Sequence, residues 1–314
     1  MNTGKDKVLL AITGPTASGK TSLAVDLASI FKSEIVSFDS RQFYREMKIG
    51  TARPSPEEMR DIPHHFIASH SIKQAYSAGK YARDARLLLG QLFEKHDILF
   101  AVGGSGLYLH ALVEGLPDLP AIDPNVREKL RSEWKNEGLE KLLDELQKRD
   151  PEYYAIADRK NPVRIIRALE VIRSIGRSYS YFRKAARQPL PWRVIKIGLN
   201  LPREVLYERI NSRCAQMLRA GLEKEARKLH PQRGLNALET VGYKEFFDFF
   251  EGKISREEAV RLFMRNTRRY AKRQLTWFGK DSEIHNFHPE KKESILAFLQ
   301  TELRAQPPER FTSP

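Results

Sequence analysis

Cysteine is nearly absent from this sequence of 314 residues. Its single thiol, Cys214, excludes a disulfide within the chain and any zinc site built from several cysteines. Long apolar runs are also missing, because none approaches the roughly 20 residues of a membrane-spanning helix. Residues 1–7 lead into a first strand without the pattern of a signal peptide. We therefore expect a cytoplasmic protein that acts as a monomer and has no membrane partner.

Acidic residues are outnumbered by basic ones. Lys and Arg total 54 against 40 Asp and Glu, a formal net charge of +14. Such an excess suits nucleic acid or an anionic membrane, although a merely basic soluble protein shows the same balance. Residues 261–280 carry seven Lys or Arg and no acid, with aromatic residues interleaved. That combination favours a nucleic-acid surface over a solvated helix face.

Strands alternate with helices in the first third of the chain. We predict strands at 8–13, 34–38 and 98–102, and helices at 21–31 and 77–96. This order is typical of the α/β class, with a doubly wound parallel sheet like that of P-loop NTPases. In such sheets ligands bind at the carboxyl ends of the strands, where Thr13, Asp39 and Gly103 fall.

A proline-rich break at 116–123 is followed by a purely helical stretch. The apolar spacing there predicts helices at 124–137, 138–149 and 162–175. Strand character returns at 192–202, and helices are predicted at 203–218, 221–230, 242–251, 255–278 and 290–304. We therefore predict a P-loop α/β core with C-terminal helices (1–123 and 192–314) and a helical insertion domain (124–191).

A phosphate-binding loop stands between the first strand and the first helix. Residues 14–21 read GPTASGKT, a full match to the P-loop pattern in the strand–loop–helix context that it needs. The amides of such a loop and of the following helix bind oxyanions, a lysine adds a point charge, and a threonine can offer its hydroxyl to Mg²⁺. The predicted loop residues are Gly14, Pro15, Thr16, Ala17, Ser18, Gly19, Lys20 and Thr21, with Thr21 as the metal ligand.

One carboxylate typical of P-loop hydrolases is missing. The strand 97–102 runs into Gly103 without Asp or Glu at its end, where a hydrolytic NTPase orients Mg²⁺ and water. This argues against an ATPase and less strongly against a kinase. Asp39, at the end of the second strand, has three alternatives: a metal ligand, a general base, or a helix cap.

Two arginines on one predicted helix also have alternatives. Arg209 and Arg213 are four residues apart and share a helix face. They belong either to a solvated face or to an arginine clamp on phosphate oxygens.

Seven segments together resemble the tRNA dimethylallyltransferase family, over about residues 8–280. They are GPTASGKT (14–21), DSRQFYREMKIGTARP (39–54), PHHFI (63–67), VGGSGLYLHALVEGL (102–116), NPVRIIRALEV (161–171), VGYKE (241–245) and AKRQLTWF (271–278). Many enzymes share the first segment, but the combination of DSRQ, GG-S/T-GLY, RIIRALE and KRQLTWF is specific. The departures from the family pattern remove no reactive group; they are Ser105 for Thr, Asn161 for Asp, Arg53 for Lys, and Phe43 for a smaller apolar residue.

The resemblance implies transfer of a dimethylallyl group from its diphosphate to the exocyclic N6 amine of the adenine 3′ to the anticodon of tRNA. It implies that Asp39 is the general base and that Lys20, Arg213 and Mg²⁺ stabilise the leaving diphosphate. The loop then holds an isoprenoid diphosphate, and ATP binds weakly if at all. It also implies that the helical insertion domain (124–191) binds tRNA. The implied tRNA contacts are Asp39, Ser40, Arg41, Gln42, Ser105, Arg127, Val163, Arg164, Ile165, Ile166, Arg167, Glu239, Thr240, Val241, Gly242, Tyr243 and Lys244.

Two other functions fit parts of the sequence. A P-loop nucleoside or nucleotide kinase explains the loop, Asp39 and the arginines, but leaves the basic aromatic segment 261–280 unexplained. A non-enzymatic RNA-binding module with a relic phosphate loop does not explain why Lys20, Thr21 and Asp39 are all intact.

Overall fold

The computed structural model describes residues 7–117, 122–184 and 188–305. The chain forms two compact units: a core unit of Met1–Val113 with Leu190–Pro314, and an insertion unit of Glu114–Pro189. The insertion unit contains most of the predicted insertion domain, but it begins at Glu114 rather than 124 and ends at Pro189 rather than 191. Part of the proline-rich break, 118–121, lies outside the described residues.

The core unit is built on a six-stranded sheet in the order β3-β2-β4-β1-β5-β6, with every neighbouring pair parallel. The strands are β1 Val8–Thr13, β2 Ile35–Ser37, β3 His64–His65, β4 Ile98–Val102, β5 Arg193–Leu199 and β6 Ile284–Phe287. The predicted α/β class and parallel P-loop sheet are confirmed. The sequence did not predict β3 and β6, because one has only two residues and the other has an exposed polar centre.

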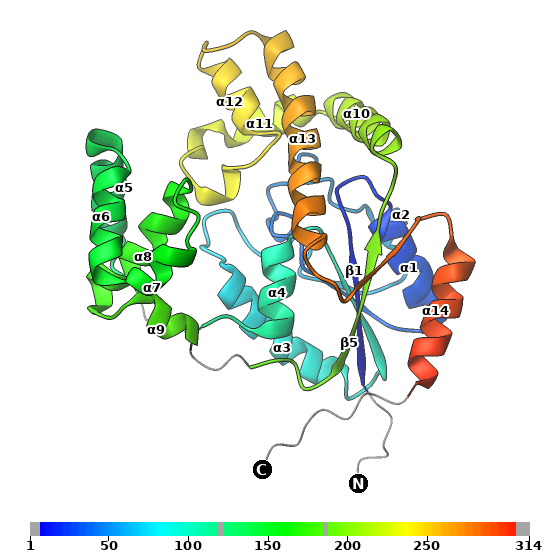
Figure 1. Cartoon of the computed structure of the whole chain (residues 1–314). Helices are drawn as coiled ribbons and strands as arrows, with labels where there is room; N and C mark the ends of the chain where they lie inside the picture. Colours follow the sequence, from blue (N-terminus) through cyan, green and yellow to red (C-terminus); the bar gives the residue numbers. More distant parts are fainter. Residues whose placement is uncertain (1–6, 118–121, 185–187, 306–314) are drawn as a thin grey trace, which may run out of the picture. The chain divides into compact units, whose positions relative to one another are not determined.

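Helices cover both faces of the sheet (Figure 1). These are α1 Lys20–Ile30, α2 Pro56–Met59, α3 Ala78–Leu92, α4 Gly106–Glu114 and α14 Lys292–Arg304. Alternate residues of β1 point to opposite faces. Val8, Leu10 and Ile12 pack with α1 and α14, and Leu9 and Ala11 pack with α3 and α4. All six residues of β1 are buried, as expected for a strand covered on both faces.

Four C-terminal helices form a second core in the same unit. They are α10 Arg203–Arg219, α11 Leu222–Leu229, α12 Lys244–Phe250 and α13 Arg256–Phe278, with short 3₁₀ turns at His230–Gln232 and Asn236–Leu238. Tyr243, Phe246 and Phe263 lie at its centre. The predicted helices in this region are confirmed to within a few residues. Helix α4 was not predicted, because its sequence GLYLHALVE is apolar nearly throughout and shows little helical periodicity.

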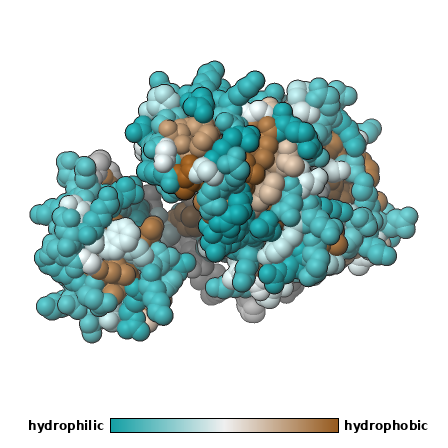
Figure 2. Space-filling view, turned by 90° about the horizontal axis from the view of Figure 1, so that it is seen from above, coloured by the Kyte–Doolittle hydropathy of each residue, from teal (hydrophilic) through white to brown (hydrophobic). Residues whose placement is uncertain are grey.

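The insertion unit consists of helices over its described residues. They are α5 Pro124–Glu137, α6 Glu140–Arg149, α7 Pro151–Ile156, α8 Pro162–Ile175 and α9 Tyr179–Lys184. Asp123, Asp150 and Asn161 each cap a helix that begins with proline, which is a strong local start signal. Helices α7 and α9 were not predicted because each has only six residues. Seen from above, the unit shows a mostly hydrophilic surface with a small apolar patch (Figure 2).

None of the helices in the described ranges is long and apolar enough to cross a membrane.

Candidate functional site

A cavity of about 390 Å³ lies where the loops after β1, β2 and β4 meet helices α10 and α13. The strand ends contribute Thr16, Asp39 and Gly103, as the parallel sheet predicted. Helices α10 and α13 supply another part of the wall, including Arg213 and Tyr270, and residues of the segments 50–54 and 239–241 supply more of it. Every lining residue belongs to the core unit.

The phosphate loop has a backbone conformation that requires positive φ angles. Ala17 and Gly19 are in the left-handed region, with φ of 65° and 92°. Gly14 has φ of 144°, and a Cβ there would lie 2.8 Å from the carbonyl oxygen of Leu199. Helix α1 begins at Lys20 without a side-chain cap. Its first amides and positive dipole end therefore favour an anion at the loop.

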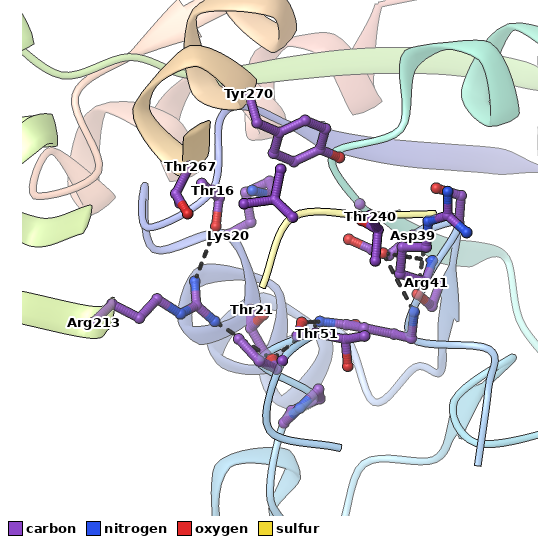
Figure 3. A pocket seen from close by; sticks show the side chains of 18 of the residues that line it. Thr16, Lys20, Thr21, Asp39, Arg41, Thr51, Arg213, Thr240, Thr267 and Tyr270 are labelled. Atoms are coloured by element: carbon purple, nitrogen blue, oxygen red, sulfur yellow. Dashed lines mark hydrogen bonds between the residues drawn. The ribbon is translucent and has the colours of Figure 1, made fainter. Parts of the chain in front are cut away.

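Lys20 lies at the base of the cavity (Figure 3). Its ammonium group donates to the carbonyl oxygen of Pro15 at 2.6 Å. Burial, followed by the positive charge of Arg213, lowers the pKa of Lys20 to about 7, although the negative charge of Asp39 acts in the opposite direction. A bound anion would compensate both cations, so the electrostatics of this end favour a diphosphate or a similar group.

The structure separates the two arginines that the sequence could not distinguish. The Arg213 guanidinium reaches into the cavity, 3.5 Å from the Thr16 hydroxyl and 3.4 Å from the Ala52 carbonyl oxygen (Figure 3). Arg209 instead pairs with the exposed Glu290 at 3.1 Å. Only Arg213 therefore joins the phosphate loop, and the solvated-face interpretation holds for Arg209.

Asp39 lies across the cavity from Arg213, with Lys20 between them in this view (Figure 3). Its Oδ1 accepts the backbone N–H of Arg41 at 3.0 Å and that of Gln42 at 3.4 Å. A turn rather than a helix follows Asp39, so the helix-cap alternative is wrong; the carboxylate caps that turn and also lines the cavity. Burial and then the negative charge of Asp39 raise the pKa of Tyr270, which keeps that hydroxyl protonated.

Most of the predicted tRNA contacts in the core unit surround this cavity. Ser105 joins them, because its hydroxyl accepts the Ser40 N–H and donates to the Ser40 hydroxyl, both at 2.9 Å. The predicted residues that line the cavity are Asp39, Ser40, Arg41, Gln42, Glu239, Thr240 and Val241. Lys244 pairs with Glu239 at 2.7 Å. Gly242 has φ of 93° and lies close to the ring of Phe263.

Arg41 holds part of this wall in place. Its guanidinium donates to three backbone carbonyl oxygens, those of Asn236, Ala237 and Glu239, at 2.8–3.3 Å. This ties the DSRQ segment to the segment before Thr240.

Three of the predicted tRNA contacts are residues whose side chains are buried, so the prediction is wrong for these side chains. Ile165 and Ile166 are 0% and 5% exposed and belong to the core of the insertion unit. Tyr243 is 0% exposed, and its hydroxyl donates to Glu225 at 2.7 Å. Glu225 also accepts the amides of Lys48, Ile49 and Gly50, so Tyr243 helps to fix that loop. Their apolar or ring surfaces stabilise the fold rather than meeting RNA.

Two predicted contact arginines of the insertion unit share one carboxylate. Glu170 is 2% exposed, and it accepts from Arg127 at 2.5 and 3.0 Å and from Arg167 at 3.1 Å. Val163 and Arg164 are exposed at the start of α8. Val163 directly precedes the RIIRALE segment, and Arg164 and the partly exposed Arg167 form its accessible part.

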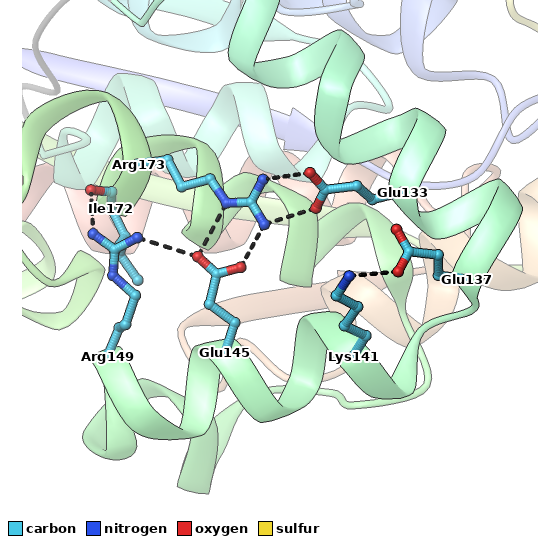
Figure 4. A network of polar contacts seen from close by, with 7 residues as sticks. All are labelled: Glu133, Glu137, Lys141, Glu145, Arg149, Ile172 and Arg173. Atoms are coloured by element: carbon cyan, nitrogen blue, oxygen red, sulfur yellow. Dashed lines mark hydrogen bonds and ion pairs between the residues drawn. The ribbon is translucent and has the colours of Figure 1, made fainter.

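A second ion-pair network ties three helices of the insertion unit together (Figure 4). Arg173 on α8 donates to Glu133 on α5 and to Glu145 on α6. Arg149 joins Glu145 and the carbonyl oxygen of Ile172. Hydrogen bonding to Arg173 is the largest cause that lowers the pKa of Glu133 and of Glu145.

Residues of α13 that the sequence did not assign to a site also line the cavity. They are Phe263, Thr267, Tyr270, Arg273 and Gln274. The basic pattern of this segment suggested a surface for RNA, and its inward face was overlooked. The available signal was Gln274 itself, an uncharged polar residue at a buried position of an otherwise basic helix.

The profile of the IPP transferase family matches residues 42–281. A tRNA dimethylallyltransferase of Cytophaga hutchinsonii is 49% identical over 299 residues, covering 95% of this chain and 98% of that protein. A crystal structure of a tRNA isopentenylpyrophosphate transferase from Bacillus halodurans is similar with a TM-score of 0.71 and 38% identity, covering 95% of this chain and 97% of that one. A eukaryotic dimethylallyltransferase that acts on tRNA shares the fold, with a TM-score of 0.80 at 22% identity over 98% of this chain and 82% of that one. The chain therefore belongs to the IPP transferase family.

Proposed function

We propose that this protein transfers a dimethylallyl group from dimethylallyl diphosphate to the N6 amine of the adenine 3′ to the tRNA anticodon, position 37, releasing diphosphate. One observation carries the proposal: a phosphate loop and the two basic residues Lys20 and Arg213 share a single cavity with the carboxylate of Asp39. The names of the relatives point to the same reaction. We further propose that it acts as a cytoplasmic monomer.

The donor end of the cavity suits an allylic diphosphate. Breaking the C–O bond spreads positive charge over the allyl group and leaves negative charge on the diphosphate. Loop amides, Lys20 and Arg213 would stabilise that anion as it forms. No attacking water has to be oriented, so the bare end of β4 at Gly103 is no defect for this reaction.

Mg²⁺ fits this donor end as a partner of the diphosphate. Among the described residues no group of three or more His, Cys, Asp or Glu could hold a metal ion. Mg²⁺ usually takes one or two protein oxygens and completes its shell with water and phosphate oxygens. The Thr21 hydroxyl in the cavity wall would be its protein ligand. When bound, the ion would offset charge on the leaving diphosphate.

The acceptor end requires a base. The lone pair of an adenine amine is delocalised into the ring, so the amine attacks poorly unless its proton leaves as the new bond forms. We assign Asp39 to that proton. The bond from the allyl C1 to oxygen breaks, the bond from C1 to N6 forms, and one N6 proton moves to the Asp39 carboxylate.

The adenine must leave its stack to reach this cavity. An anticodon loop is single-stranded, which lowers the cost of extrusion. Arg269 and Lys272 are exposed on α13 and would contact the tRNA backbone. A P-loop kinase is disfavoured because it gives these exposed cations no role and because the similar proteins are prenyltransferases by name.

The test combines purified protein, Mg²⁺, dimethylallyl diphosphate and unmodified tRNA, followed by nucleoside analysis. We expect N6-dimethylallyladenosine at one site per tRNA. A parallel reaction replaces the donor with ATP and offers nucleosides as acceptors. Phosphorylated nucleoside at ordinary kinase rates, without prenylated adenosine, would overturn the proposal.

A further inference from the structure

Gln274 on α13 connects the two loops that form the ends of the cavity. Its Oε1 accepts the backbone N–H of Thr16 in the phosphate loop at 2.9 Å. Its Nε2 donates to the carbonyl oxygen of Gly104, in the loop after β4, at 2.8 Å. The side chain is 5% exposed, so water does not compete for these bonds. One buried amide thus bridges segments that lie far apart in the sequence.

The Gln274 amide satisfies both partners at once, because it carries an acceptor and a donor at the end of a long side chain. Thr16 offers a donor and Gly104 an acceptor, which fixes the orientation of the Gln274 amide. A carboxylate at this position could not donate to Gly104, and an ammonium group could not accept from Thr16. A thioether of the same length would leave both backbone groups buried and unpaired, which is costly.

The loop after β4 is shaped to receive α13. A Cβ on Gly104 would lie 2.2 Å from Nε2 of Gln274, and one on Gly106 would lie 2.1 Å from Cδ1 of Trp277. Two glycines of the GGSG segment therefore provide space for two residues of the KRQLTWF segment. The bridge is seated by close packing as well as by hydrogen bonds.

From this bridge a chain of contacts leads to the proposed base. Gly104 is followed by Ser105, whose hydroxyl holds both the N–H and the hydroxyl of Ser40. Ser40 directly follows Asp39. In the other direction Thr16 belongs to the phosphate loop and touches Arg213. Gln274 is therefore linked through contacts to both the donor end and the acceptor end.

We propose that Gln274 is a positioning residue that sets the distance between the leaving diphosphate and the attacking amine, an inference that rests on the proposed function. A displacement at carbon requires the nucleophile and the leaving group to be held in line at close range. A shift of about 1 Å in such a geometry can cost 10²-fold in rate. Gln274 spends both of its amide groups on backbone partners, so its proposed role is to position the loops rather than to react.

The first test compares Gln274→Met and Gln274→Glu with the wild type. Met removes both bonds at similar length, and Glu keeps the acceptor for Thr16 but sets a carboxylate against the Gly104 carbonyl. We expect the single-turnover rate with both substrates saturating to fall about 10- to 100-fold in each variant. Affinities for tRNA and for dimethylallyl diphosphate should stay within about threefold, because their main contacts lie elsewhere. Gln91→Met, at an exposed glutamine of α3, is the matched control and should keep the wild-type rate.

The second test uses Gly104→Ala. Alone it should slow the reaction, because the added Cβ displaces the Gln274 amide. Combined with Gln274→Ala, which vacates that space, it should add no further loss, so the two effects are not multiplicative.

The outcomes separate the inference from the proposed function. An inactive wild type would overturn both. If the wild type is active, three results would overturn the positioning role alone. The variants could lose only melting temperature, they could keep the saturated rate within twofold of the wild type, or the rate losses of Gly104→Ala and Gln274→Ala could multiply in the double variant.

Discussion

One oxygen of the Asp39 carboxylate, Oδ1, accepts the backbone N–H of Arg41 at 3.0 Å and so serves the turn that follows β2. An asparagine could keep this bond through its own Oδ1. The same substitution removes the ability to accept a proton. Asp39→Asn therefore distinguishes a base from a cap more sharply than a truncation to alanine.

We expect Asp39→Asn to lower kcat by about 10²–10⁴-fold, the usual contribution of general base catalysis. Donor affinity, tRNA affinity within a few-fold, and melting temperature should be retained. Single-turnover rates with both binding constants check this. Asp39→Ala, the comparison variant, should lose a further ~1 kcal/mol of folding stability with the cap. A near-normal rate would remove Asp39 from the mechanism, and weaker donor binding rescued by excess Mg²⁺ would make it a metal ligand.

Arg213→Ala should weaken transition-state stabilisation by about 2–4 kcal/mol in kcat/KM, because the guanidinium faces the leaving group. Arg209→Ala is the matched control, one turn earlier on α10 and paired only at the surface. It should behave like the wild type, and both variants should bind tRNA normally. Equal effects of the two changes in steady-state kinetics would contradict the assignment.

Donor binding should depend on pH through Lys20. The pKa of Lys20 is about 7 in the free protein, and a bound diphosphate favours its charged form and raises that pKa. Binding above pH 7 must then take up a proton, so donor affinity should fall between pH 7 and 9, at most tenfold per pH unit. Calorimetric titration in two buffers of different ionisation enthalpy measures this uptake. Lys20→Met should bind more weakly and without pH dependence; proton uptake that survives in this variant would point to another group.

The basic helix should contain both anchoring and RNA-binding cations. Arg268 donates to Asn211 at 2.6 Å, so Arg268→Gln should lower the melting temperature more than it lowers tRNA affinity. Arg269→Gln and Lys272→Gln lie on the exposed side and should weaken tRNA binding. Each lost phosphate contact should reduce the slope of log affinity against log salt by roughly one at most. Binding measured from low to moderate salt decides the point, and an unchanged slope in both variants would argue against a backbone contact.

The insertion unit should be acid-sensitive through Arg173. This arginine holds the pKa of Glu133 and Glu145 below the ordinary value. Because the pKa of each glutamate is lower in the folded state, its ionised form stabilises folding at any pH above the unfolded-state pKa, near 4.3. This contribution to folding stability is lost as pH falls through the lower, folded-state pKa. Arg173→Met should lower the free energy of unfolding of the insertion unit by about 1 kcal/mol at pH 7, after allowance for solvent screening. Below about pH 4.3, the stability of this variant should fall less steeply with pH than that of the wild type.

Hydrogen exchange of the amides in α5, α6 and α8 across this pH range reports the effect locally. The exposed pair of Lys141 and Glu137 supplies the control, since Lys141→Met should change exchange little. Equal protection in wild type and Arg173→Met at pH 7 would show that the network is dispensable.

Sequence reasoning succeeded where the physics is local. An apolar run, a glycine-rich loop and a following helical stretch define β1, the loop and α1 without distant information. Arg209 and Arg213 could not be separated, because spacing fixes a shared face and tertiary contacts decide which residue reaches the cavity. The role of Gln274 depends on partners 258 and 170 residues away. Ile165 and Ile166 were misassigned because they lie inside a family segment, although their apolar spacing on α8 already indicated a core position.

The strand order also affects how the newly made chain must behave. β1 pairs with β4 on one side and with β5 on the other, and the 76 residues of the insertion unit are synthesised between β4 and β5. At typical translation rates of about 5–20 residues per second, the 90 residues between the end of β4 at Val102 and the start of β5 at Arg193 take roughly 5–18 s. For this time one edge of the central, fully buried strand β1 has no partner on the ribosome, and such edges promote aggregation. We therefore expect chaperones to bind the emerging N-terminal segment until β5 pairs with β1.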